Sequence, residues 1–135
     1  MKGGCIYTHN GREYWLVCTA DAYFDILAAY GGDFGEKILA AGRDGFDCAI
    51  GCLCILAREG ELCRRYMGYE PLDMMNEEEI RRVTLVGDIG KIQACVLSAM
   101  EAGMRIEKEA DEKNAGPVDV GLLKFEKKTE ISLKV

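Results

Sequence analysis

The most apolar part of the chain reads FDCAIGCLCILA, residues 46–57. Read as a helix, this stretch carries aliphatic residues on one face and cysteines on its flank, so it is apolar nearly all round. Such a helix is buried on several sides, and we expect it to form the centre of the fold. We expect it to continue past Gly60 as far as Met67, before Gly68 and Pro71 stop it.

Two short segments upstream, residues 5–9 and 12–18, are rich in β-branched and aromatic residues. Asn10-Gly11 lies between them and suits a type I′ turn, because both residue types tolerate a positive φ. The pattern predicts a β-hairpin. Thr19 then has the position of a helix N-cap.

Apolar residues at helical spacing predict further helices on both sides of the central stretch. These helices are expected over residues 20–30, 34–41, 77–86 and 89–103, with Gly42 to Gly45 as the break before the central helix. Asn76 is the expected cap of the third, and Gly87 and Gly90 are expected to kink or split it from the fourth. The predicted fold class is α+β, an N-terminal β-hairpin packed on a bundle of four to five α-helices.

The chain has 135 residues, enough for one compact unit, which we place at residues 1–104. Residues 105–135 are predicted to be a charged linker and C-terminal tail. This tail contains two apolar clusters: Leu122, Leu123 and Phe125, and then Ile131, Leu133 and Val135. The second cluster alternates with polar residues, which suits a short strand on a sheet edge; a flexible tail is the alternative.

Composition argues against several classes of function. The net charge of −6 disfavours nucleic acid as a partner, since an acidic surface repels phosphate. Gly87 and Gly90 have the spacing of a KH-type Gly-x-x-Gly loop, but Asp88 puts a negative charge where phosphate would lie. No apolar run is long enough for a membrane span. The seven cysteines are odd in number and follow no signal peptide, so we expect reduced thiols in the cytoplasm.

Catalytic patterns are also lacking in the sequence. His9 is the only histidine, and the only serines are Ser98 and Ser132, so a Ser-His-Asp triad is not credible. Acidic groups such as Glu77 to Glu79 are explained as helix caps and solvated faces. We therefore expect neither an enzyme nor a bound cofactor.

The cysteines near the chain centre leave two readings open. Cys48, Cys52, Cys54 and Cys63 are thiols of the kind that bind zinc or iron–sulfur clusters, yet they lack the Cys-x2-Cys spacing of such sites. Cysteine is also among the residues most often buried as a small hydrophobe, so packing is the favoured interpretation. A metal site formed by Cys48, Cys52 and Cys63 is the alternative.

Methionine and tyrosine residues are concentrated around Pro71, in a segment that is expected to be a loop between helices. Methionine and tyrosine are the side chains that adaptable binding surfaces use. The expected partner-binding residues are Tyr66, Met67, Tyr69, Met74 and Met75, together with Ile131 and Leu133 in the tail. The alternative is that the segment folds back to cover the core.

A family resemblance adds to this reading. Three stretches carry it: GREYWL at residues 11–16, TADAYFDI at 19–26 and YGG at 30–32. They resemble the opening of the tail assembly chaperones of Gram-positive-type siphophages and prophages, and the layout of helices agrees in order over about residues 5–104. The resemblance implies a small, non-virion protein of the host bacterial cytoplasm.

The resemblance also implies partners. Such a protein binds the tape-measure protein, keeps it soluble and brings tail-tube subunits to it during tail morphogenesis. A cysteine-bearing metal or redox domain, and a small interaction or regulatory module, are the competing hypotheses. Self-association is a further expectation, because methionine and tyrosine are expected at the surface.

Overall fold

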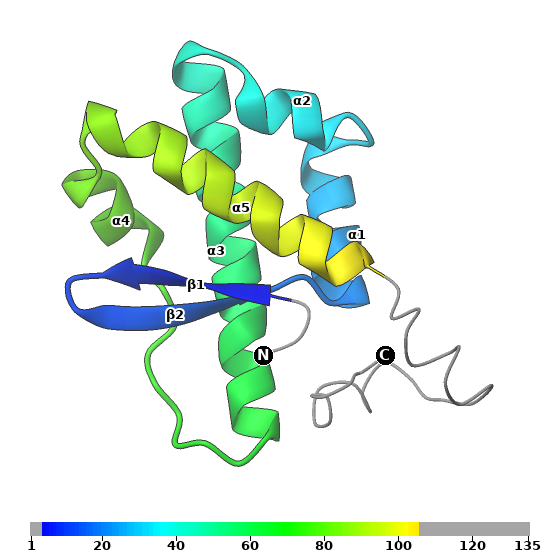
Figure 1. Cartoon of the computed structure of the whole chain (residues 1–135), viewed down its shortest axis with the longest axis vertical. Helices are drawn as coiled ribbons and strands as arrows, with labels where there is room; N and C mark the ends of the chain where they lie inside the picture. The colour runs from blue at the N-terminus through cyan, green and yellow to red at the C-terminus, as the bar shows by residue number, and fades with distance from the viewer. Residues whose placement is uncertain (1–3, 106–135) are drawn as a thin grey trace.

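The computed structural model describes residues 4–105 and confirms the predicted α+β class, with a β-hairpin packed on five α-helices (Figure 1). The elements are β1 (Gly4–His9), β2 (Arg12–Val17), α1 (Ala20–Tyr30), α2 (Phe34–Leu39), α3 (Gly42–Tyr66), α4 (Glu77–Val83), the 3-10 turn η1 (Val86–Asp88) and α5 (Ile89–Met104). The predicted tail from residue 106 onward lies outside the described residues.

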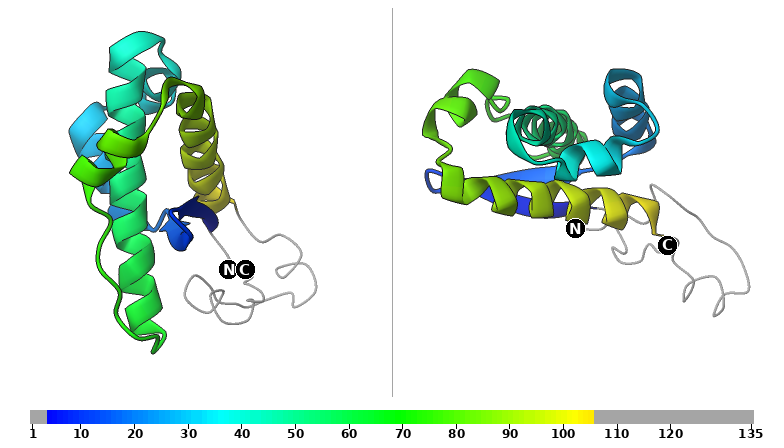
Figure 2. Two further views of the ribbon diagram at one scale, coloured as in Figure 1. Left: turned by 90° about the vertical axis from the view of Figure 1, so that its left-hand side faces the viewer. Right: turned by 90° about the horizontal axis from the view of Figure 1, so that it is seen from above.

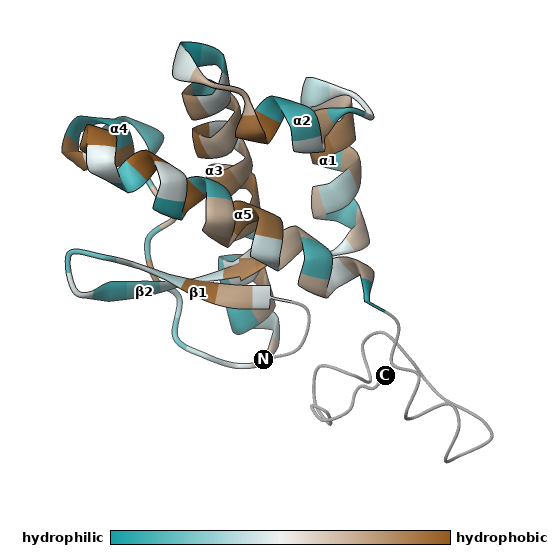
Figure 3. Cartoon of the chain, turned by 45° about the horizontal axis from the view of Figure 1, so that its top comes forward, coloured by the Kyte–Doolittle hydropathy of each residue, from teal (hydrophilic) through white to brown (hydrophobic). Residues whose placement is uncertain are grey.

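Helix α3 is the centre of the fold, as its apolar sequence predicts. It runs for 25 residues and is contacted by β2, α1, α2, α4 and α5. Seen from above, α1 and α4 lie on opposite sides of α3 and α5 runs along a third side (Figure 2). Ile50, Leu53 and Leu56 are fully buried there. Apolar residues follow α3 and α5, whereas the turn end of the hairpin is hydrophilic (Figure 3).

The hairpin has the predicted turn. Asn10 and Gly11 adopt φ values of 51° and 78°, which is the pair of positive angles that a type I′ turn requires. The strands are antiparallel, and Tyr7 pairs with Tyr14. Both tyrosines are buried on the face that packs into the core, together with Leu16.

Two helix caps are also confirmed. The side chain of Thr19 accepts a hydrogen bond from the backbone N–H of Ala22 at 3.2 Å, and that of Asn76 accepts one from Glu79 at 3.0 Å. Each cap satisfies an N–H group that has no partner inside its helix. The predicted split before α5 is present, and the α4 axis and the η1–α5 stretch meet at a bend of 113°. Its place differs from the prediction, because α4 ends at Val83 and the break lies at residues 84–85, while Gly87 belongs to η1 and Gly90 to α5.

The start of α3 differs from the prediction, because α3 begins at Gly42 and the break lies at residues 40–41. The glycines that suggested a break are instead part of the first turn. A Cβ on Gly45 would lie 1.7 Å from the carbonyl oxygen of Ala40, so glycine is needed there for close approach. Gly60 has the same role further along α3, where a Cβ would lie 1.8 Å from the carbonyl oxygen of Trp15 in β2.

Within residues 4–105, no single helix combines the length and apolar character of a membrane span. The α4 and η1–α5 pair passes a test of length and composition only when its two parts are taken together across the bend.

The contact at Gly60 gives a stability prediction. We expect Gly60→Ala to lower the free energy of unfolding by about 1–3 kcal/mol, because the β2 backbone must move away from α3. Gly35→Ala in α2 is the matched control, since a Cβ there meets nothing within 4 Å and alanine favours a helix. Urea denaturation of both variants measures the difference. Equal stability of the two variants would contradict the close packing of β2 on α3.

Candidate functional site

The segment between α3 and α4 is a loop, as predicted. α3 ends at Tyr66 and α4 begins at Glu77, and the chain between them runs back beside the lower half of α3 (Figures 1 and 2). Large apolar side chains are exposed along it: Tyr66, Met67, Tyr69, Leu72 and Met74. We call these five residues the loop surface. Tyr66 is the most exposed, at 81%.

A buried carboxylate holds this loop in place. Glu61 of α3 is only 4% exposed, and its Oε2 accepts a hydrogen bond of 2.7 Å from the backbone N–H of Leu72. Arg64 donates to Oε1 at 2.8 Å, and Arg65 donates to Oε2 at 2.9 Å. The same arginines also donate to the carbonyl oxygens of Glu70 and Leu72. The loop backbone is therefore fixed to the last turns of α3 by charge-assisted hydrogen bonds.

These contacts set the charge state of Glu61. Burial alone disfavours a carboxylate, but the hydrogen bonds from Leu72 and the two arginines outweigh it and lower the pKa of Glu61. Glu61 is therefore ionised at neutral pH, and the loop is anchored there.

One residue of the predicted partner-binding set, Met75, packs against the core, and another, Tyr69, is exposed but also contacts its neighbours. Tyr69 is half-exposed, and its ring makes an edge contact with Trp15 at 5.6 Å, with the guanidinium of Arg64 5.3 Å above the tyrosine ring. Met75 packs against the core, with its sulfur 3.8 Å from the thiol of Cys54. The loop thus does both things that the sequence left open: it covers part of the core and still presents Tyr66, Met67 and Met74 to solvent.

Sequence reasoning missed the residues that anchor the loop. Glu61, Arg64 and Arg65 have the i, i+3 and i, i+4 spacing of helical ion pairs, which was a visible signal. Their bonds to the loop backbone were not, because no local pattern shows which carbonyl oxygens return to the helix.

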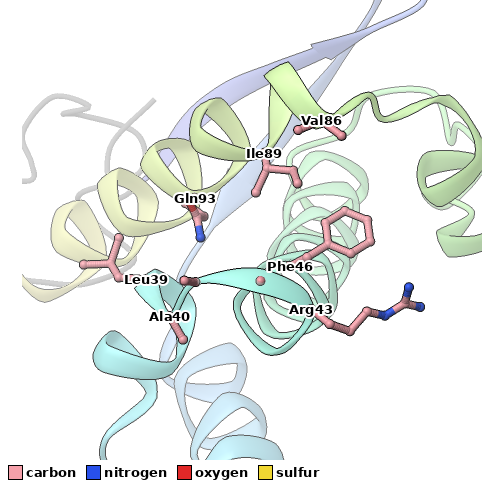
Figure 4. A pocket seen from close by; sticks show the side chains of 9 residues that line it. Leu39, Ala40, Arg43, Phe46, Val86, Ile89 and Gln93 are labelled. Carbon is pink, nitrogen blue, oxygen red and sulfur yellow. The ribbon is translucent and has the colours of Figure 1, made fainter.

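A second apolar site lies at the opposite end of α3, and sequence reasoning missed it. A cavity of about 500 Å³ opens between the α2–α3 junction and the start of α5. We call it the α2–α5 groove; it is lined mainly by Leu39, Ala40, Phe46, Val86, Ile89 and Gln93. In Figure 4, Phe46, Val86 and Ile89 lie around the opening, while the guanidinium of Arg43 points away. The side-chain amide of Gln93, in α5, donates a hydrogen bond of 2.8 Å to the carbonyl oxygen of Ile38, in α2.

Three cysteines, Cys18, Cys48 and Cys52, are buried, the other four are half-buried, and the seven do not gather into one cluster. Cys48 and Cys52 are buried as neighbours one turn apart on α3, but Cys63 lies eleven residues beyond Cys52, about 16 Å along the helix axis. Burial raises the pKa of Cys63 and of Cys18 to about 11 and that of Cys54 to about 12. Uncharged thiols are poor metal ligands and weak nucleophiles.

Within the described part of the chain, no three or more His, Cys, Asp or Glu side chains are grouped so as to hold a metal ion. The predicted contact residues Ile131 and Leu133 lie outside the described residues. Comparison of the chain with protein-family models, with curated proteins and with solved structures finds no match.

The Glu61 anchor gives a prediction with a defined pH dependence. At pH 7 we expect Glu61→Gln to lower the free energy of unfolding by about 1.5–3 kcal/mol, because charge-assisted hydrogen bonds are lost. The folded-state pKa lies below the unfolded value of about 4.3, so the carboxylate stabilises fully above that pH. The difference between wild type and variant should shrink as the pH falls through the lowered pKa. Denaturation at several pH values measures it.

Glu70→Gln is the matched control for Glu61, since only the backbone carbonyl of Glu70 contributes to the anchor. Chymotrypsin provides a second readout. We expect faster cleavage beside Tyr69 in Glu61→Gln than in the control. A loop equally resistant in both variants would contradict the anchoring role.

The buried thiols give a prediction about metal. We expect the purified protein to contain no stoichiometric zinc or iron, and its thermal midpoint to stay unchanged with EDTA, because the thiols are neutral and dispersed. Elemental analysis and thermal scans test this. One bound metal per chain, with a lower midpoint in EDTA, would support the metal-site alternative at Cys48, Cys52 and Cys63.

Proposed function

We propose that this chain is a non-catalytic tail assembly chaperone of a siphophage or prophage. It acts in the cytoplasm of the bacterial host, binds the tape-measure protein and helps to recruit tail-tube subunits. The observation that carries this proposal is the loop surface, where tyrosine and methionine side chains face solvent on a backbone fixed by Glu61.

The chemistry of the loop surface fits an apolar helical partner. A folded protein normally covers its large apolar side chains, so a fixed cluster of exposed ones indicates a surface that is used. Methionine adapts to irregular apolar shapes, and tyrosine combines a flat apolar ring with a polar end. A tape-measure protein is long, carries apolar stripes and tends to aggregate when alone. The loop surface offers such a stripe an apolar contact.

The charge of the body supports the same function. The chain has a net charge of −6, which keeps a complex soluble while an apolar contact is buried. The resemblance at residues 11–32 to tail assembly chaperones points to the same partner. A metal function lacks comparable support, because within residues 4–105 no three or more His, Cys, Asp or Glu side chains are grouped so as to hold a metal ion.

Co-expression tests this proposal. We expect the tape-measure protein encoded beside this gene to become soluble and to co-purify with this chain at a defined stoichiometry. The variant Tyr66→Ser, Met67→Ser and Met74→Ser should abolish co-purification, because these side chains are exposed and play no part in the Glu61 anchor. Circular dichroism should show that the triple variant and the wild-type chain are folded alike.

The matched control changes exposed apolar residues elsewhere. Phe24→Ser with Met104→Ser alters α1 and the end of α5 and should leave co-purification intact. An insoluble tape-measure protein, with this chain eluting alone, would refute the proposed function. Full co-purification of the loop-surface variant would refute the assignment of the surface.

A further inference from the structure

The α2–α5 groove exposes apolar side chains that the described body leaves uncovered. Val86 is 86% and Leu39 is 61% exposed, and Leu85, which precedes Val86 in the chain, is 70% exposed. The volume of about 500 Å³ is in the range of sites that take up a few apolar side chains. The groove lies at the end of α3 opposite the loop surface, so it is independent of the proposed contact with the tape-measure protein.

We propose that the groove is a docking site for this chain's own C-terminal segment, with Leu122, Leu123 and Phe125 as the groups that enter it. These three residues place two aliphatic side chains and one aromatic ring within four positions. Such a compact cluster suits a pocket. Ile131, Leu133 and Val135 alternate with polar residues, a spacing that instead suits the edge of a sheet.

The length of chain beyond α5 allows this docking. The groove is near Ile89 at the start of α5, and the tail leaves from Arg105 at its end, about 24 Å away along a helix of 16 residues. Residues 106–121 precede the apolar cluster, and a chain of this length can span up to about 50 Å. The connection therefore reaches the groove with slack, and a tether of this kind gives an effective concentration of about millimolar.

Charge favours the same arrangement. Residues 4–105 contain ten basic and sixteen acidic side chains, a net charge of −6. Residues 121–135 contain four lysines and two glutamates, a net charge of +2, and are attracted to this body. The connecting residues 106–120 have two lysines and five acidic residues, a net charge of −3, and are not attracted to the acidic body. The apolar cluster is thus carried by the one part of the tail whose charge complements the body.

Hydrogen–deuterium exchange on the full chain tests this proposal without any partner. In Leu122→Ser, Leu123→Ser, Phe125→Ser, we expect backbone exchange at residues 39–46 and 85–93 to become several-fold faster than in wild type. The matched control Ile131→Ser, Leu133→Ser, Val135→Ser should exchange like wild type there. Binding of the dye ANS, which reports exposed apolar surface, should rise in the first variant only.

The remaining outcomes also decide the question. Unchanged exchange in the first variant, or an equal change in both variants, would overturn the proposal. Protection that grows with protein concentration would show that the segment comes from a second copy, which also overturns docking within one chain. Because no tape-measure protein is present, failure here leaves the proposed function standing.

Discussion

The structure depends on the burial of α3 from several sides at once. β2, α1, α2, α4 and α5 all pack on it, and its aliphatic residues are fully buried. A helix surrounded in this way must let neighbouring backbones come close, and Gly45 and Gly60 provide the space. A methyl group at Gly45 would collide with the carbonyl oxygen of Ala40 at the end of α2, and one at Gly60 with that of Trp15 in β2. The hairpin and the end of α2 therefore approach α3 at its glycines, where no side chain stands in the way.

The far end of α3 uses a different kind of interaction. There a nearly buried carboxylate, Glu61, accepts hydrogen bonds from two arginines and from the loop backbone. Apolar packing alone would draw the methionines and tyrosines of this loop onto the core, as it does for Met75. The polar anchor fixes the loop backbone at Glu70 and Leu72, and Tyr66, Met67 and Met74 on either side of it are exposed. An electrostatic contact thus fixes the middle of the loop that carries the apolar surface of the proposed function.

The two apolar surfaces are separated by the length of the central helix. Phe46 lies in the groove and Tyr66 lies at the loop surface, twenty residues apart and therefore about 30 Å along α3. Close to the groove, Arg81 joins α4 to Asp47 of α3 at 2.8 Å and lowers the pKa of that carboxyl. Separate surfaces hold separate occupants, so the partner proposed for one end and the tail segment proposed for the other do not compete.

Local signals in the sequence determined the elements. The Asn10-Gly11 turn, the Thr19 and Asn76 caps and the all-round apolar stretch of α3 each act within a few residues, so each is legible in the sequence. Only the tertiary structure decided what the glycines of α3 are for, which loop residues turn inward and where the α2–α5 groove opens. Those features join residues far apart along the chain, such as Gly60 with Trp15 and Phe46 with Val86. No periodicity encodes such pairs, because they exist only once the helices have packed.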